Sequence, residues 1–244
     1  MLTILYRDEH LVAIDKPAGL LVHRSNIDRR ETRFAVQLLR DQIGCRVQPV
    51  HRLDKGTSGV LLFATDPECT RRLGAQFECN EVGKDYLAVV RGWPPESGCI
   101  DHALSRTHDD YGAAPGARAS LPARTDYRRL ATVELPHAVD RYPTARYALL
   151  ALTPHTGRRH QLRRHLKHLA HPIVGDATYG KGSHNRFFQR QFGCHRLLLA
   201  CVRLRLRHPV TSVELSVRAP VGAELARLFD ALGWTDAVAR QGAA

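Results

Sequence analysis

Short apolar runs, separated by turns and by segments of helical spacing, constrain the fold of this chain more than any other feature. Runs of this length that are bounded by Gly, Pro, Asp or Thr are typical of β-strands. We interpret as strands residues 2–5, 11–14, 60–65, 86–90, 125–135, 146–152, 196–206 and 213–217. Apolar residues recur at helical spacing in residues 34–43, 67–79, 156–171 and 223–232. The mixture predicts a protein of the α+β class.

Residues 51–59 present an acid on a tight loop, immediately before the strand expected at 60–65. Asp54 stands between two cations, Arg52 and Lys55, and the small and polar residues 56–59 follow. Glycine in such a loop lets the backbone bend sharply and approach a ligand. A carboxylate held in this way can act as a catalytic group, but the same pattern also fits a structural ion pair that caps the loop.

The net charge indicates which kinds of molecule the chain could bind. Lys and Arg number 36 against 24 for Asp and Glu, which gives a formal net charge of +12. A surplus of this size favours a polyanion, either nucleic acid or an anionic membrane surface. No apolar run approaches the roughly 20 residues that span a bilayer, and the N-terminus lacks the features of a signal peptide. We therefore expect a protein that does not enter the membrane.

The cysteines indicate a reducing compartment. There are six, and no two of them form a Cys-x-x-Cys pair. Scattered cysteines of this kind fit free thiols in the cytoplasm better than a disulfide framework or a zinc site. The six are Cys45, Cys69, Cys79, Cys99, Cys194 and Cys201.

The segment 156–171 is the most basic part of the chain. On a helix, Leu162, Leu166 and Leu169 share one face. The opposite face then carries His160, Arg164, Lys167, His168 and His171. A solvated surface normally mixes charge signs, but no acid occurs between Arg158 and His171, so we expect phosphate binding. A metal site at His165, His168 and His171 is disfavoured, because arginines crowd these positions and no carboxylate or cysteine lies among them.

Several segments, spread in order along nearly the whole chain, together form a known pattern. They are Asp15-Lys16-Pro17-Ala18-Gly19, His51-Arg52-Leu53-Asp54 with Thr57-Ser58-Gly59, Lys84-Asp85-Tyr86, Thr156-Gly157-Arg158, His160-Gln161-Leu162-Arg163, and His171-Pro172-Ile173-Val174-Gly175-Asp176. In this order the chain resembles the RluA-type branch of the pseudouridine synthases. The first segment departs from the family, which usually has Asn and Ser where this chain has Asp15 and Ala18, so those two positions receive no role.

The resemblance implies the pseudouridine synthase fold, with a largely antiparallel mixed sheet flanked by helices and a catalytic cleft across it. We expect one catalytic domain over residues 1–236, built from two tightly joined subdomains. Residues 105–123, rich in Ala, Gly, Pro, Ser and His, are expected to form a mobile loop, and residues 237–244 a C-terminal tail. Because residue 2 already begins the catalytic fold, no separate N-terminal RNA-binding module is expected.

The implied reaction isomerises uridine to pseudouridine: the N1–C1′ bond breaks, the uracil rotates, and C5 joins C1′. Asp54 matches the family's essential aspartate, Arg163 the arginine that pairs with it, and Tyr86 the aromatic residue that stacks on the uracil and is proposed to help remove the C5 proton. Arg52 is expected to help hold the nucleotide out of its stack. Whether Asp54 attacks C1′, adds to the base or removes a C2′ proton stays open. No cofactor and no metal are needed.

The segments Val22-His23-Arg24-Ser25 and Arg40-Asp41-Gln42-Ile43-Gly44, with residues 157–166, look like the subgroup that modifies uridine 65 of tRNA. The resemblance therefore implies tRNA as the substrate and partner. Candidate contacts to its phosphates are Arg158, Arg159, Arg164 and Lys167. Ribosomal RNA is the alternative substrate, and an RNA-binding protein without catalysis is the alternative in another class. A glycoside hydrolase fits poorly, because it usually needs paired carboxylates and aromatic sugar platforms. We expect a monomer.

Overall fold

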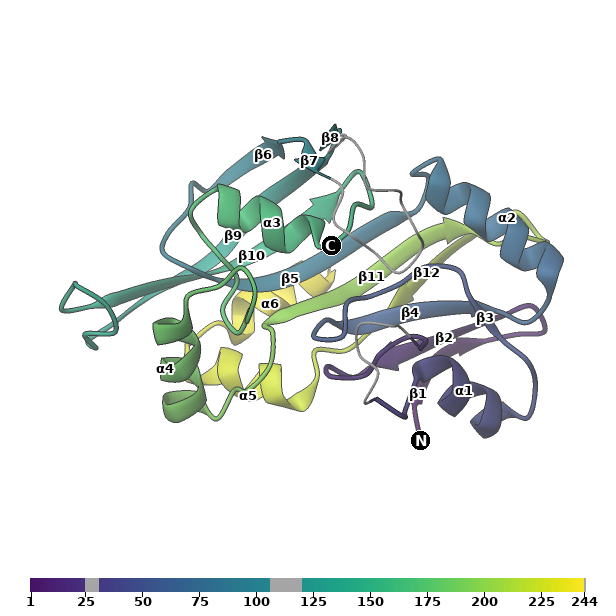
Figure 1. Cartoon of the computed structure of the whole chain (residues 1–244), viewed down its shortest axis with the longest axis horizontal. Coiled ribbons are helices and arrows are strands. Elements are labelled where there is room, and N and C mark those ends of the chain that lie inside the picture. The colour runs from purple at the N-terminus through teal and green to yellow at the C-terminus, as the bar shows by residue number, and fades with distance from the viewer. Residues whose placement is uncertain (25–30, 106–119, 244) are drawn as a thin grey trace.

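The computed structural model describes residues 1–24, 31–105 and 120–243 (Figure 1). The helices are α1 Ala35–Ile43, α2 Pro67–Glu78, α3 Gln161–His168, α4 Gly182–Phe192, α5 Ala223–Ala231 and α6 Thr235–Ala243. The strands are β1 Thr3–Arg7, β2 Leu11–Lys16, β3 Gln48–Pro49, β4 Ser58–Ala64, β5 Gly83–Arg91, β6 Ser97–Asp101, β7 Leu104–Ser105, β8 Ser120–Leu121, β9 Arg124–Leu135, β10 Ala145–Pro154, β11 Leu199–Arg207 and β12 Glu214–Arg218. Every apolar run interpreted as a strand overlaps one, which confirms the α+β class.

The central feature is a 10-stranded sheet in which β1, β2, β4, β11, β5, β10, β9 and β6 follow one another, while β12 pairs with β11 and β3 with β4. Among its described strands, β4 and β11 run parallel and the other pairs are antiparallel. This parallel contact joins an N-terminal half to a C-terminal half (Figure 1). The loop 51–57 enters β4 at this junction, so the candidate acid lies where the two halves meet.

Apolar side chains on the C-terminal half alternate between the two faces of the sheet, as successive residues of a strand must. One face packs against α4 and α5, and the other packs against α3 (Figure 1). Leu87, Val89, Tyr147 and Leu149 belong to the first face; Ala88, Val90, Ala148 and Leu150 belong to the second. Because β5 and β10 are covered on both faces, their sequences are almost continuously apolar.

The capping residues that the sequence predicts at the start of α2 and at the end of α1 are confirmed. Asp66 caps α2, since its side chain accepts a hydrogen bond from the backbone N–H of Cys69, and Pro67 occupies the first helical position. Gly44 ends α1 in the left-handed conformation, with φ of 72°. An acceptor before a helix and a glycine after it satisfy backbone groups that the helix itself leaves open.

The structure corrects several expectations. Helix α3 begins at Gln161 rather than near residue 156, because Thr156 and Arg158 are tied to the Gln161 side chain outside the helix. Residues 237–243 are not a tail but part of α6, in which Ala237 is buried. Helix α4 and strand β6 were missed. Of the expected mobile loop 105–123, residues 106–119 lie outside the described part of the chain.

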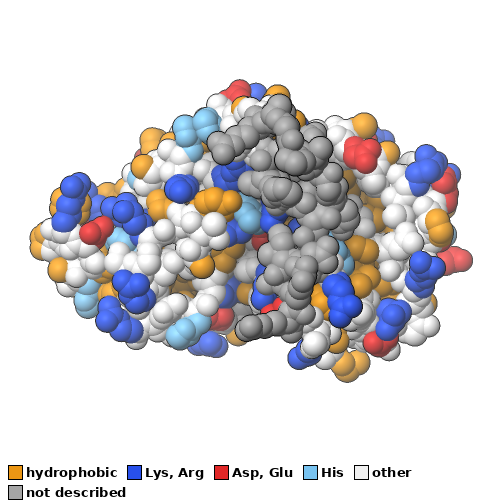
Figure 2. Space-filling model, in the orientation of Figure 1, with side chains coloured by type: hydrophobic (Ala, Val, Ile, Leu, Met, Phe, Trp, Pro, Cys, Tyr) orange, Lys and Arg blue, Asp and Glu red, His pale blue; other side chains and the backbone are white. Residues whose placement is uncertain are grey.

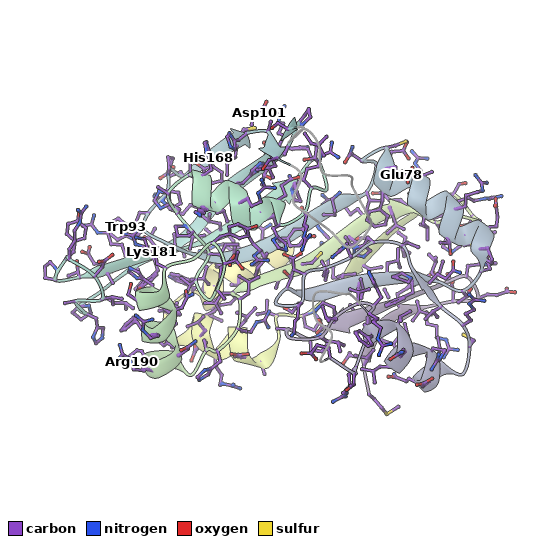
Figure 3. The ribbon with its side chains drawn as sticks, in the orientation of Figure 1. Glu78, Trp93, Asp101, His168, Lys181 and Arg190 are labelled. Carbon is purple, nitrogen blue, oxygen red and sulfur yellow. The ribbon has the colours of Figure 1, made fainter. Side chains whose placement is uncertain are left out.

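Basic side chains are spread over the face of the molecule that Figure 2 draws. On the face drawn in Figure 2, Lys and Arg lie on both sides of the centre and are more widespread than Asp and Glu. Figure 3 places Lys181 and Arg190 at the two ends of α4, while His168 at the end of α3 and Asp101 of β6 lie along the upper edge. In the described ranges, we find no helix that combines the length and apolar character required for a membrane crossing.

Candidate active site

A buried lysine, Lys16, contacts the loop that carries Asp54. The Lys16 side chain is fully buried, and its ammonium group donates hydrogen bonds to the carbonyls of Pro17, Leu20 and Lys55. Burial, together with the charge of Arg196, lowers the pKa of Lys16 to about 7, although Asp54 and Asp15 oppose the change. Lys16 therefore anchors the residue that directly follows Asp54.

Gly59 explains how this loop can enter the sheet so closely. Its φ is +108°, and a Cβ atom there would lie 1.9 Å from the carbonyl oxygen of Cys201. The parallel contact between β4 and β11 thus requires glycine at this position, both for the backbone conformation and for space.

Asp54 is paired with Arg163 of α3, as the family resemblance predicts. Arg163 Nη1 donates to Asp54 Oδ2 over 3.0 Å. The rest of the guanidinium donates two hydrogen bonds to Asp176, at 2.7 Å from Nε and 2.9 Å from Nη2. The exposed fractions of the side chains are 22% for Asp54, 11% for Arg163 and 0% for Asp176. Only the carboxylate of Asp54 in this trio reaches substantial solvent, and it is available to a ligand.

Asp176, which the sequence identifies only as part of a motif, orients the Arg163 side chain. Burial works against its charge, but the hydrogen bonds from Arg163 and from the backbone N–H of Tyr179 outweigh burial and lower its pKa. For Arg163, burial is likewise outweighed, by Asp176 first and then by Asp54, and its pKa is raised. Helix α4 holds the backbone at residues 175–176 in place. Its Asn185 side chain accepts a hydrogen bond from the N–H of Gly175 and donates one to the carbonyl of Asp176. Arg163 is thus a rigid, permanently charged clamp.

Two adjoining cavities share Asp54. The first, of about 380 Å³, extends from Asp54 to Tyr86 and is also lined by Arg158 and Arg159. The second, of about 860 Å³, lies on the side of His195. The residues that line both cavities are Arg52, Leu53, Asp54, Arg159, His160 and Arg163. A ligand that bridges the two cavities would lie among these shared residues, which include Asp54.

Tyr86 lines the first cavity together with Asp54, as expected if both residues contact one nucleotide. It is paired across the sheet with Cys201 of β11. Burial, with smaller effects of Cys201 and Asp54, raises the pKa of Tyr86 well above its usual range. The hydroxyl is therefore protonated at neutral pH, and in the resting protein it is a hydrogen-bonding group rather than a phenolate base.

His160 does not lie on the outward face of α3, contrary to expectation. It precedes the helix with φ of 53° and ψ of 27°, which turns its ring toward Asp54. Its Nε2 lies 3.8 Å from Asp54 Oδ1, and its Nδ1 lies 3.1 Å from the hydroxyl of Tyr179. Because the helix starts at Gln161, helical facing could not locate this residue.

The four residues expected to contact phosphate fall into two groups. Arg158 and Arg159 line the first cavity. Arg164 instead donates to the carbonyl and hydroxyl oxygens of Ser105, and Lys167 is exposed, with its ammonium 5.7 Å from the centre of the Tyr179 ring. Arg52 is exposed at the mouth of both cavities.

The histidines considered for a metal serve different partners. His165 lies within hydrogen-bond distance of Thr125 and of the His102 carbonyl, and His171 within that of the Arg91 carbonyl. Elsewhere, the ligand atoms of His10, Asp66 and Cys69 lie within 4.8 Å of one another. Asp66 already caps α2 there, and burial raises the pKa of the Cys69 thiol to about 11. We assign no metal to that group.

With this geometry, the chain can be compared with known proteins. A family model described as RNA pseudouridylate synthase matches residues 10–168. The tRNA pseudouridine synthase C of Vibrio vulnificus is 48% identical over 236 residues, which cover 96% of each chain. That of Yersinia pestis is 48% identical over 237 residues, covering 96% of this chain and 92% of the relative.

Solved structures agree in fold. Human RNA Pseudouridylate Synthase Domain Containing 1 superposes with a TM-score of 0.69 at 28% identity, covering 91% of this chain and 84% of the human one. Human RNA Pseudouridylate Synthase Domain Containing 4 gives a TM-score of 0.70 at 26% identity, with 95% and 93% covered. The fold, with its large mixed sheet, is therefore shared with these proteins.

Proposed function

Because the chain belongs to the RNA pseudouridylate synthase family, we propose that it isomerises a specific uridine of tRNA, uridine 65, to pseudouridine. The observation that carries the proposal is the Asp54 carboxylate, held by Arg163 where two adjoining cavities meet, one of which is also lined by Tyr86. The near full-length similarity to tRNA pseudouridine synthase C proteins supports tRNA as the substrate. The surplus of positive charge supports a polyanionic partner of this kind.

In the proposed mechanism the target nucleotide leaves its stack and enters the first cavity. Its uracil packs against the ring of Tyr86, and Arg52 at the cavity mouth holds the displaced nucleotide. Asp54 then meets the ribose near C1′, and Arg163 keeps the carboxylate charged and oriented throughout the reaction. The bond from N1 to C1′ breaks, and the bond from C5 to C1′ forms. The C5 proton is lost and N1 gains a proton, so the reaction consumes no co-substrate.

The remaining features of the proposal follow from the same observations. Each of the six cysteines, all in the described part of the chain, is free. Free thiols fit a reducing compartment, which supports the cytoplasm as the place of action. We retain a monomer as the acting form, and Arg158 and Arg159, which line the first cavity, as the best-placed contacts to the RNA backbone.

Replacing Tyr86 by Phe tests the hydroxyl apart from the ring. The ring can still stack, so the KM for tRNA should change little. If the hydroxyl assists removal of the C5 proton, kcat should fall by about 10²-fold or more, as is typical of proton-transfer groups. Steady-state kinetics on a tRNA transcript measures both constants. An unchanged kcat would limit Tyr86 to stacking.

Phosphate contacts predict a strong dependence of binding on salt. Each phosphate neutralised by Lys or Arg releases counterions, so the tRNA affinity should fall roughly 10²-fold or more between about 50 and 200 mM KCl. Fluorescence anisotropy of labelled tRNA over this range gives the slope. A flat response would contradict a phosphate-dominated interface. Arg158→Ala should reduce the slope, whereas the control Arg71→Ala, at an exposed position on α2, should leave it unchanged.

Mapping pseudouridine in a strain that lacks the gene tests the function itself. The loss of pseudouridine from tRNA position 65, restored by the wild-type gene, is the expected result. Loss from ribosomal RNA instead would establish the alternative substrate. If no pseudouridine is lost from either RNA, and the purified protein forms none in vitro, the chain is an RNA-binding protein without this activity.

A further inference from the structure

His160 is held in a backbone conformation that few residues other than glycine adopt. Its φ of 53° lies in the left-handed region, which among the other residue types Asn, Asp and His enter most readily. Such strain persists where the surrounding structure enforces it, and it occurs preferentially at functional sites. Here it turns the ring away from the exposed side of α3 and into the space shared by the two cavities. The side chain is 21% exposed, so a ligand can reach it.

Tyr179 fixes which ring nitrogen of His160 faces the site. The Tyr179 hydroxyl lies 3.1 Å from Nδ1. Tyr179 is itself held by its backbone N–H, which donates to Asp176, and by its ring, which lies 5.0 Å from the Arg163 guanidinium carbon. Burial lowers the pKa of His160, and the charges of Arg163 and Arg159 lower it further, against the effect of Asp54. The neutral imidazole has one N–H.

The position of Asp54 decides where that N–H lies. A bare Nε2 lone pair directed at the nearby carboxylate would be repelled by it, so the favoured tautomer has the proton on Nε2 and accepts at Nδ1 from Tyr179. The distance of 3.8 Å from Nε2 to Asp54 Oδ1 is longer than a hydrogen bond. The Nε2–H group therefore forms no hydrogen bond to Asp54 and can donate one to a ligand beside the carboxylate.

We propose that His160 binds the ribose 2′-hydroxyl of the target nucleotide and thereby selects ribonucleotide over deoxyribonucleotide. The inference rests on the proposed function, in which Asp54 acts at or next to C1′. The 2′-hydroxyl is attached to the carbon beside C1′, so a donor a few ångströms from Asp54 is well placed to reach it. This hydroxyl is also the group by which a protein distinguishes RNA from DNA at a given nucleotide.

The test compares two tRNA transcripts that differ at one atom, with uridine or 2′-deoxyuridine at the target position. Wild type, His160→Asn and His160→Gln are assayed for kcat/KM and for the dissociation constant of each transcript. Asn suits the left-handed backbone, but its amide is too short to replace Nε2. The Gln amide can reach the position of Nε2 and donate. Any effect of the missing hydroxyl on the chemistry is common to all three proteins and cancels in the ratio.

We expect the preference of the wild type for ribose to fall about tenfold in His160→Asn, the size of one hydrogen bond, and to be partly restored in His160→Gln. A residue that only supports the fold would lower activity on both transcripts equally. An unchanged ratio of ribose to deoxyribose in both variants would overturn the inference. If wild type forms no pseudouridine on the ribose transcript, the proposed function fails, and the ratio of dissociation constants still decides the role of His160.

Discussion

Asp54→Asn should abolish pseudouridine formation while leaving the fold and tRNA binding intact. The amide has nearly the same shape and can still accept a hydrogen bond from Arg163 Nη1, which now donates to Oδ2 over 3.0 Å. It lacks the negative charge and the basicity that every proposed route requires. We expect kcat to fall by about 10²–10⁴-fold or below detection, the range for loss of an acid–base group, and more if the carboxylate acts as a nucleophile.

The measurement is pseudouridine per tRNA after reaction with purified protein, with tRNA affinity and the unfolding midpoint taken on the same preparation. Asp101→Asn is the matched control, because Asp101 is an exposed carboxylate on β6 (Figure 3). It should behave as wild type. Full activity of Asp54→Asn would refute a catalytic role for this residue, whereas loss of both binding and folding would indicate the structural ion pair that the loop sequence also permits.

Arg163→Met should lose activity and, in addition, destabilise the protein. The substitution removes the partner of Asp54 and leaves the fully buried carboxylate of Asp176 without its two guanidinium hydrogen bonds. Removing one partner of a buried ion pair typically costs about 3–5 kcal/mol. Urea unfolding at pH 7 measures this loss. Arg163→Lys keeps the charge but not the forked geometry, so its loss of stability should be smaller.

The pH dependence of this variant has a definite sign. In wild type, the partners of Asp176 lower its pKa below 3.8, the value in the unfolded chain. The ionised carboxylate therefore stabilises the fold above pH 3.8, and this contribution is lost as the pH falls through the lowered pKa of the folded protein. In Arg163→Met, burial is offset only by the backbone N–H groups of Thr178 and Tyr179, so the pKa of Asp176 rises and protonation removes the cost of burying the charge. The difference in stability between the two proteins should shrink from pH 7 to about pH 4. A constant difference would mean that Asp176 is not the source of the destabilisation.

The parts of the fold that follow short-range rules could be predicted from the sequence. The runs that became β4, β5 and β10 are buried on both faces and so carry a strong apolar signal, and Asp66 and Gly44 are local caps. Helix α4 was missed because its N-cap, Lys181, makes no side-chain cap hydrogen bond and no acidic residue occupies its first turn. Its Phe187 and Phe188 are buried against a sheet that the sequence alone does not place beside them.

The site was predicted only in part, for a related reason. The match to a known family located Asp54, Tyr86 and Arg163, although they come from a loop, a strand and a helix far apart in the sequence. His160 was placed wrongly, because its facing depends on where α3 starts, and the Gln161 side chain sets that start through long-range and local hydrogen bonds. The support from Asp176 to Arg163 could have been suspected, since a buried arginine needs an acid, but nothing in the sequence identified which acid.

The most direct test of the whole account is a structure of the Asp54→Asn variant bound to tRNA with an intact target uridine. We expect the uracil to be out of the RNA stack in the first cavity, against the Tyr86 ring, with C1′ in contact with the side chain at position 54 and Arg163 still paired to that side chain. A target uridine that stays stacked in the RNA, or that lies elsewhere on the protein with its ribose distant from position 54, would contradict the assignment of Asp54 as the catalyst.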